Sequence, residues 1–107
     1  MATIDMDREQ FERSLREEKP TLIDFWAPWC SYCRRIGPAY EKIAEEYGDT
    51  LTAGKVNIDE APQLAEAERI EVIPTLVLYR DGRAVDSITA PDSKAAIDRF
   101  LKAALEK

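Results

Sequence analysis

Trp29-Cys30-Ser31-Tyr32-Cys33 contains both cysteines of this 107-residue chain. In a helix, positions i and i+3 lie on one face with their Cβ atoms about 5–6 Å apart. A disulfide needs a similarly short Cβ separation of about 3.5–4.5 Å. The spacing therefore predicts that Cys30 and Cys33 interconvert between dithiol and disulfide with only a small local adjustment.

The flanking sequence places this pair where a strand ends and a helix begins. The apolar run Leu22–Trp26 comes just before it, and apolar residues at helical spacing follow it. The first turn of a helix offers unpaired N–H groups and the positive end of the helix dipole, which stabilise a thiolate. We therefore expect Cys30 to act as the nucleophile and Cys33, one turn later and more buried, to resolve the mixed disulfide.

Two other interpretations of the cysteine pair are a structural disulfide and half of a metal site. A disulfide that closes so short a loop stabilises a fold little in the chain-entropy model. Zinc prefers four ligands, and the chain has no histidine and no further cysteine. We therefore expect no metal and no cofactor other than the redox-active disulfide itself.

The composition is that of one globular domain spanning residues 1–107, with 45% hydrophobic and 34% charged residues. The net charge of −6 argues against nucleic acid and anionic membranes as main partners. The sequence has no apolar run long enough for a membrane-spanning helix and no visible signal peptide at its start. We therefore expect a cytoplasmic protein, although a secreted chain that has lost its signal would look the same.

The order of the elements predicts an α/β fold with a mixed sheet of four to five strands and four helices that cover both faces. Strands are expected at about 21–26, 51–58, 75–79 and 84–89. Helices are expected at about 7–19, 30–47, 62–67 and 93–105, the last capped by Asp92 or Ser93. Asp81-Gly82 predicts a hairpin turn. The helical apolar stripe continues beyond Gly37-Pro38, which favours one helix across the proline over two separate helices.

Several segments along the chain carry a family resemblance, and they are Leu22-Ile23-Asp24-Phe25-Trp26-Ala27, Trp29-Cys30 with Cys33, Pro38, Lys55-Val56-Asn57-Ile58-Asp59, Ile73-Pro74-Thr75 and Asp81-Gly82. Through these segments, and across essentially its whole length, the chain resembles the thioredoxin family. The resemblance implies the thioredoxin fold, a central mixed sheet flanked by four helices. It also implies dithiol–disulfide exchange with disulfide-containing protein substrates.

The resemblance also assigns roles to three residues outside the cysteine pair. Asp24 interrupts an apolar run, and from strand alternation alone it could equally well face water. Similarity to the family favours a buried carboxyl that exchanges a proton with Cys33, with Lys55 nearby. Pro74 alone could simply be a proline at the start of a strand, but the family has a cis bond here that exposes the Ile73 backbone to an extended substrate.

The remaining candidates surround Cys30. We expect Trp29, Tyr32, Ile58 and Ile73 to form an apolar rim for substrates, although Trp29 could instead pack into the core. Ser31 lies between the cysteines, and Ala90 stands where the family usually carries a glycine close to the substrate.

Ser31-Tyr32 departs from the Gly-Pro dipeptide of typical thioredoxins, and its tyrosine is similar to that of the Pro-Tyr pair of glutaredoxins. A hydroxyl from either residue could donate to the Cys30 thiolate, which would stabilise the reduced form. We therefore expect a reduction potential above that of ordinary thioredoxin, in the range of roughly −200 to −260 mV. Ala90, Pro91 and Val72 are further departures from the family, and they could either narrow the range of substrates or weaken docking to the usual flavin-dependent reductase.

The sequence thus predicts a monomeric protein-disulfide reductase. The resemblance implies a flavin-dependent thioredoxin reductase as one candidate electron donor, and the sequence leaves open whether this chain uses it. One alternative in the same chemical class is a more oxidising enzyme, either a disulfide oxidant or isomerase or a glutathione-linked protein with glutaredoxin-like activity. Another is a binding module in which the cysteines are dispensable.

Overall fold

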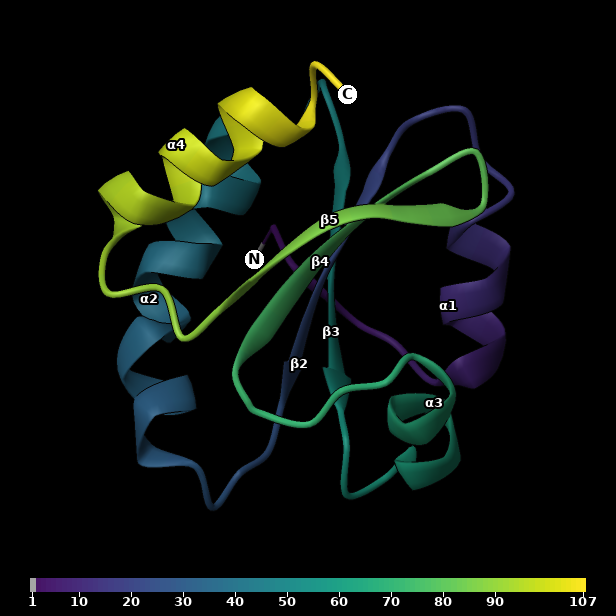
Figure 1. Cartoon of the computed structure of the whole chain (residues 1–107), viewed down its shortest axis with the longest axis vertical. Coiled ribbons are helices and arrows are strands. Elements are labelled where there is room, and N and C mark those ends of the chain that lie inside the picture. Colours follow the sequence, from purple (N-terminus) through teal and green to yellow (C-terminus); the bar gives the residue numbers. More distant parts are fainter. Residues whose placement is uncertain (1) are drawn as a thin grey trace.

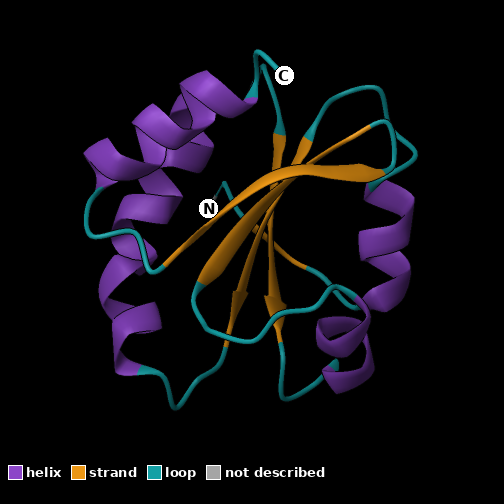
Figure 2. Cartoon of the chain, viewed as in Figure 1, coloured by secondary structure: helices purple, strands orange, loops and turns teal. Residues whose placement is uncertain are grey.

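The computed structural model describes residues 2–107, which form a mixed sheet of five strands between two pairs of helices (Figures 1 and 2). The strands are β1 (Ile4–Asp5), β2 (Thr21–Trp26), β3 (Thr52–Asn57), β4 (Thr75–Arg80) and β5 (Arg83–Thr89), in the spatial order β1-β3-β2-β4-β5. β3 runs parallel to both β1 and β2, whereas β4 is antiparallel to β2 and to β5. This arrangement confirms the predicted α/β fold.

The helices are α1 (Arg8–Ser14), α2 (Ser31–Glu46), α3 (Pro62–Ala67) and α4 (Lys94–Ala104). In Figure 1, α2 and α4 lie together on one side of the sheet, and α1 and α3 lie on the other side. Both faces of the sheet are therefore covered, as the near-continuous apolar sequence of its central strand requires.

Alternate residues of β2 enter two separate cores. Leu22 packs with Tyr40 and Ile43 of α2 and with residues of α4, whereas Ile23 and Phe25 pack with residues of α1 and α3. All five of these side chains are at most 1% exposed. Because β2 is fixed from both sides, the turn that follows its last residue is fixed as well.

The long helix α2 begins directly after Cys30 and continues through Pro38 to Glu46. Proline removes one backbone hydrogen bond from a helix interior. The buried stripe nevertheless continues on both sides of it, with Ile36 before the proline and Tyr40 and Ile43 after it. The prediction of a single helix across Gly37-Pro38 is confirmed.

The N-terminal part of the chain differs from the prediction in two ways. α1 ends at Ser14 rather than near Lys19, because the charged segment 16–19 has no apolar face to bury. The short strand β1 was not predicted, since its two exposed residues carry no alternation and are held only by pairing with Gly54 and Lys55 of β3.

Two predictions from short sequence motifs, the hairpin turn at Asp81-Gly82 and a cap at the start of α4, are confirmed. Asp81 and Gly82 both have positive φ, at 54° and 80°, as a tight hairpin turn requires. Ser93, rather than Asp92, caps α4 through the bond from the Ala96 N–H to its hydroxyl. Within residues 2–107, no helix combines the length and apolar character needed to cross a membrane.

The Tyr40 hydroxyl joins α2 to the two central parallel strands and provides a test of this packing. It lies 3.1 Å from the Leu22 carbonyl oxygen and 2.8 Å from that of Gly54, and it is buried. Tyr40→Phe removes this buried donor from the two carbonyl oxygens that share it, so we expect it to lower the free energy of unfolding by about 1–3 kcal/mol in urea denaturation. Tyr47→Phe is the matched control, because its hydroxyl bonds to Asp98 near the surface. Equal losses in the two variants would contradict the importance of the Tyr40 bridge.

Candidate active site

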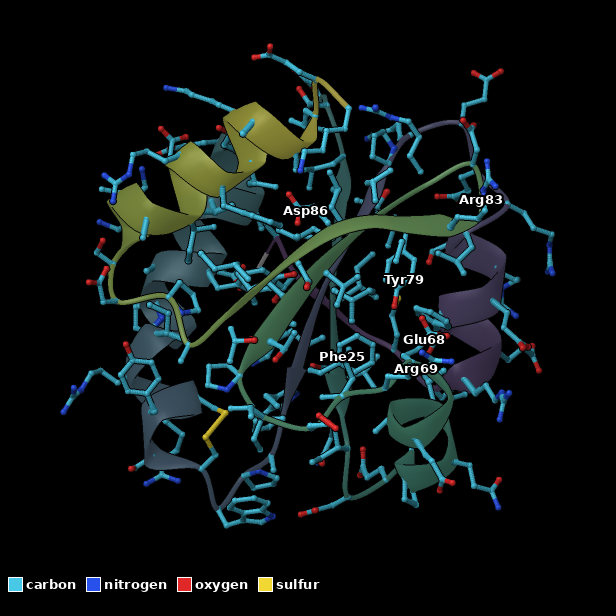
Figure 3. All side chains as sticks on the ribbon, viewed as in Figure 1. Phe25, Glu68, Arg69, Tyr79, Arg83 and Asp86 are labelled. Carbon is cyan, nitrogen blue, oxygen red and sulfur yellow. A yellow bond between two sulfur atoms is a disulfide. The ribbon has the colours of Figure 1, made fainter. Side chains whose placement is uncertain are left out.

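The two cysteines lie at the start of α2, and the structure contains them as a disulfide with their Cα atoms 5.3 Å apart. Figure 3 draws this bond between the sulfur atoms in yellow, beside the first turn of the helix. β2 ends at Trp26, and a turn closed by the bond from the Cys30 N–H to the Ala27 carbonyl oxygen leads into the helix. The end of the central strand thus sets the position of Cys30.

Cys30 occupies the N-cap of α2, where its sulfur accepts a hydrogen bond from the Cys33 backbone N–H at 3.2 Å. A negative sulfur at this position is stabilised by the unpaired N–H groups of the first turn and by the helix dipole. Cys33 is 4% exposed, whereas Cys30 is only partly buried. An incoming disulfide therefore has access to Cys30 first.

The segment before β4 faces Cys30 across the site. The peptide bond between Ile73 and Pro74 is cis, as the resemblance implied. The Cys30 sulfur lies 4.0 Å from the Ile73 carbonyl oxygen. Within residues 2–107, neither the N–H nor the carbonyl of Ile73 pairs with another backbone group. The Ile73 backbone is therefore free to pair with an extended segment beside the disulfide.

Two large apolar side chains adjacent in sequence to Cys30 and to Ile73 are exposed. Trp29 is 66% exposed, which excludes the interpretation that it packs into the core, and Val72 is 54% exposed. The Trp29 indole N–H donates to the Asp59 carboxylate at 3.1 Å, so the exposed ring has a fixed orientation. Ile73 is partly buried, and so is Ile58, which packs against the core on the α1 and α3 side of the sheet. The contact to Asp59 was not predicted, because no local pattern links residues 30 positions apart.

Asp24 lies in the interior, with 1% of its surface exposed, so the alternative in which it faces water is wrong. Burial raises the pKa of this carboxyl from 3.8 to about 7, and the positive charge of Lys55 opposes part of that rise. Its Oδ1 atom is buried and, within residues 2–107, has no hydrogen-bond partner. The chain therefore holds a carboxyl that can take up and release a proton near neutral pH.

Lys55 is the register partner of Asp24 on the neighbouring strand β3. Its ammonium lies over the Trp26 ring, 4.5 Å from the ring centroid, which is a cation–π contact. A cavity of about 790 Å³ is lined by Lys55 and Trp26 and by neither cysteine. Solvent thus reaches Lys55, while Asp24 behind it stays buried.

In the disulfide form that the structure contains, neither residue between the cysteines donates a hydrogen bond to the Cys30 sulfur, and the contact expected in the thiolate form stays a prediction. The Tyr32 hydroxyl donates to the Pro91 carbonyl oxygen at 3.0 Å, and Ser31 is exposed. A tyrosine hydroxyl has one proton to donate, so in the disulfide form that of Tyr32 is engaged away from Cys30. The only hydrogen bond to the Cys30 sulfur from residues 2–107 comes from the Cys33 backbone.

A metal-binding alternative receives no support from the side chains present. Within residues 2–107, no three His, Cys, Asp or Glu side chains are grouped as metal ligands would be. The predicted catalytic residues lie toward one end of the central strands. Asp24 of β2 is paired with Lys55 of β3, and Pro74 precedes β4 where that strand pairs with the end of β2. Cys30 and Cys33 follow the same end of β2.

Comparison with known proteins agrees with this geometry. The sequence model of the family described as Thioredoxin matches residues 2–103. A thioredoxin of Alicyclobacillus acidocaldarius is 35% identical over 105 residues, which cover 98% of this chain and 100% of the relative. A thioredoxin of Mycolicibacterium smegmatis is 40% identical over 107 residues, covering 97% and 96% of the two chains. A thioredoxin of Acidithiobacillus ferridurans is 43% identical over 91 residues, covering 85% and 84%.

The raised pKa of Asp24 makes stability depend on pH. Between about pH 4 and pH 7 the folded chain keeps a proton that the unfolded chain has released, so stability falls as pH rises through this range. Asp24→Asn removes this dependence. We expect the variant to gain stability relative to the parent as pH rises, by up to a few kcal/mol at about 1.4 kcal/mol per pKa unit. Urea unfolding at several pH values measures the difference, and parallel pH profiles for the two proteins would contradict it.

Proposed function

Because this chain belongs to the thioredoxin family and is a thiol–disulfide oxidoreductase with Cys30 and Cys33 as its redox pair, we propose that it reduces disulfides in other proteins. The observation that carries the proposal is the asymmetry of the pair. Cys30 is accessible at the helix start, and Cys33 is buried one turn later, within bonding distance of it.

In this proposal the Cys30 thiolate attacks one sulfur of the substrate disulfide. A mixed disulfide forms, and the other substrate sulfur leaves as a thiolate. Cys33 then loses its proton and attacks the Cys30 sulfur, which forms the Cys30–Cys33 disulfide and releases the second substrate sulfur. Two electrons pass from the chain to the substrate, and the substrate takes up two protons to become a dithiol.

Asp24 is the group that we propose accepts the Cys33 proton. A carboxyl with a pKa of about 7 is half ionised near neutral pH, so it can serve both as acceptor and as donor. Lys55 acts through Asp24 as a positioning residue, since its charge favours the ionised carboxylate and it lies beside solvent. The chain has no histidine that could take this role.

Substrate binding is proposed to use the backbone and the rim beside the disulfide. The unpaired Ile73 backbone next to cis-Pro74 can bond to an extended segment that carries the target cysteine. The exposed ring of Trp29, together with Ile58, Ile73 and Tyr32, offers apolar contact, and Ser31 and Ala90 border the same space.

The reductant direction is favoured over the oxidising alternatives by one contact. The expectation of a raised potential depended on a hydroxyl donated to Cys30, and the Tyr32 hydroxyl instead bonds to Pro91. Ser31 is then the one residue of the Ser31-Tyr32 dipeptide whose hydroxyl is left to donate to Cys30. An oxidant, an isomerase or a glutathione-linked enzyme therefore has less support than a reductant.

A reductant must be returned to its dithiol form after each cycle. We therefore propose that the chain works as a single-domain monomer in a reducing compartment, the cytoplasm, and recovers electrons from a flavin-dependent reductase. The disulfide supplies the redox chemistry, so no further cofactor is proposed. The support for a cytoplasmic location is that thiols are kept reduced in that compartment, as a C-x-x-C reductant requires.

The order of the two thiol steps predicts which variant traps a substrate. With Cys33→Ser, the mixed disulfide on Cys30 cannot be resolved, so we expect a stable covalent adduct with a peptide that carries one intramolecular disulfide. With Cys30→Ser, we expect adduct formation at least about a hundredfold slower, because Cys33 is buried and lies beyond the helix start. Mass spectrometry under non-reducing conditions measures both.

The double variant Cys30→Ser with Cys33→Ser is the control and should form no adduct. Equal trapping by both single variants would contradict the assignment of Cys30 as the nucleophile. Retention of a partner function in the double variant would instead support the binding-module alternative.

A further inference from the structure

The Tyr32 side chain bridges the first turn of α2 to the loop between β5 and α4. Its hydroxyl donates to the Pro91 carbonyl oxygen at 3.0 Å, and the Ala90 carbonyl oxygen lies 3.5 Å away. The Arg35 guanidinium lies 5.7 Å from the centroid of the tyrosine ring. The bridge therefore joins the C-x-x-C turn to a segment 59 residues further along the chain.

The loop that Tyr32 holds has an unfavourable backbone conformation. Ala90 has a φ of 47°, in the left-handed region where a Cβ atom crowds the following carbonyl. Its N–H donates to the Pro74 carbonyl oxygen at 2.8 Å. The loop is thus fastened on one side to cis-Pro74 and on the other to Tyr32. These two attachments hold alanine in a conformation that glycine would adopt more readily.

The fastened loop borders the space beside the reactive sulfur. Ile73, whose carbonyl oxygen lies 4.0 Å from the Cys30 sulfur, precedes Pro74, and Pro74 is bonded to Ala90. Ala90 is exposed, and the segment Ala90-Pro91, which is called the wall below, is held in place by the bonds to Pro74 and Tyr32. A segment that pairs with the Ile73 backbone has to pass this wall.

We propose that Tyr32 is a specificity-determining residue, which closes this wall so that Cys30 selects extended segments with small side chains next to the target cysteine. The inference rests on the proposed function, because it assumes that substrates pair with the Ile73 backbone. Tyr32 acts through the position of the Ala90–Pro91 loop. It acts on selection rather than on thiol chemistry, since its single hydroxyl proton is directed at Pro91 and away from Cys30.

The test compares two peptides whose single cysteine forms a mixed disulfide with thionitrobenzoate. One peptide has glycine on both sides of the cysteine, and the other has tryptophan. The protein is first reduced to its dithiol and then mixed with excess peptide for a single turnover. Attack by Cys30 on the peptide sulfur releases the coloured thionitrobenzoate, and the rate as a function of peptide concentration gives kcat/KM for each peptide. The variants are Tyr32→Phe, which removes only the hydroxyl, and Ala90→Gly, which removes the methyl group and suits the positive φ.

Tyr47→Phe is the matched control, because it removes a hydroxyl from the far end of the same helix, where that hydroxyl bonds to Asp98. We expect the parent to prefer the glycine peptide by about tenfold or more, and Tyr32→Phe and Ala90→Gly each to reduce this preference to about threefold or less. The change should lie mainly in KM for the tryptophan peptide. The reduction potential of the disulfide should stay the same in Tyr32→Phe, and the control should keep the preference of the parent.

Three outcomes would overturn the inference while leaving the proposed function intact. The first is no preference in the parent, and the second is an unchanged preference in Tyr32→Phe, whatever Ala90→Gly does. The third is an equal change for both peptides together with a shifted reduction potential, which would assign Tyr32 to thiol chemistry. Failure of the parent to release thionitrobenzoate from either peptide is a different result, which would overturn the proposed function and this inference with it.

Discussion

The hydrogen bond from the Cys33 backbone N–H to the Cys30 sulfur is the interaction on which the chemistry of this chain depends. It exists because Cys30 is the N-cap of α2, and Cys30 is the N-cap because β2 ends at Trp26 and a short turn follows. β2 is in turn fixed by packing on both faces of the sheet. The N-cap position leaves Cys30 partly exposed, whereas Cys33, one turn later, is 4% exposed. The proposed order of the two thiol steps therefore follows from where a strand ends and a helix starts.

A second constraint is the cost of placing a carboxyl inside the protein. Asp24 lies on the central strand with 1% exposure, and burial moves its pKa to about 7. A buried carboxyl without full hydrogen bonding lowers stability once it ionises. In the proposed mechanism this carboxyl accepts the Cys33 proton, and that role is what the cost of burial would serve. Lys55 on the neighbouring strand reduces the cost and remains in contact with solvent. Stability and the proposed proton transfer thus make opposite demands on the Asp24 side chain.

Much of the fold could be predicted because its patterns are local. The stripe of Ile36, Tyr40 and Ile43 marks α2 on both sides of Pro38, and the Asp81-Gly82 turn marks the hairpin. β1 was not predictable in this way, because Ile4 and Asp5 are exposed and owe their conformation to β3. The burial of Asp24 could not be decided from alternation, since a strand covered on both faces has no polar side. The contacts of Tyr32 with Pro91 and of Trp29 with Asp59 join distant segments, so only the folded chain reveals them.

The most direct test of this account is the pH dependence of alkylation in the reduced protein. Iodoacetamide reacts with thiolates, so its rate follows the ionised fraction of the reacting cysteine, and peptide mapping identifies which cysteine carries the adduct. If the helix start activates Cys30, the adduct forms on Cys30 and the midpoint lies well below the ordinary cysteine pKa of about 8.5. A midpoint at or above that value, or an adduct mainly on Cys33, would contradict the central claim.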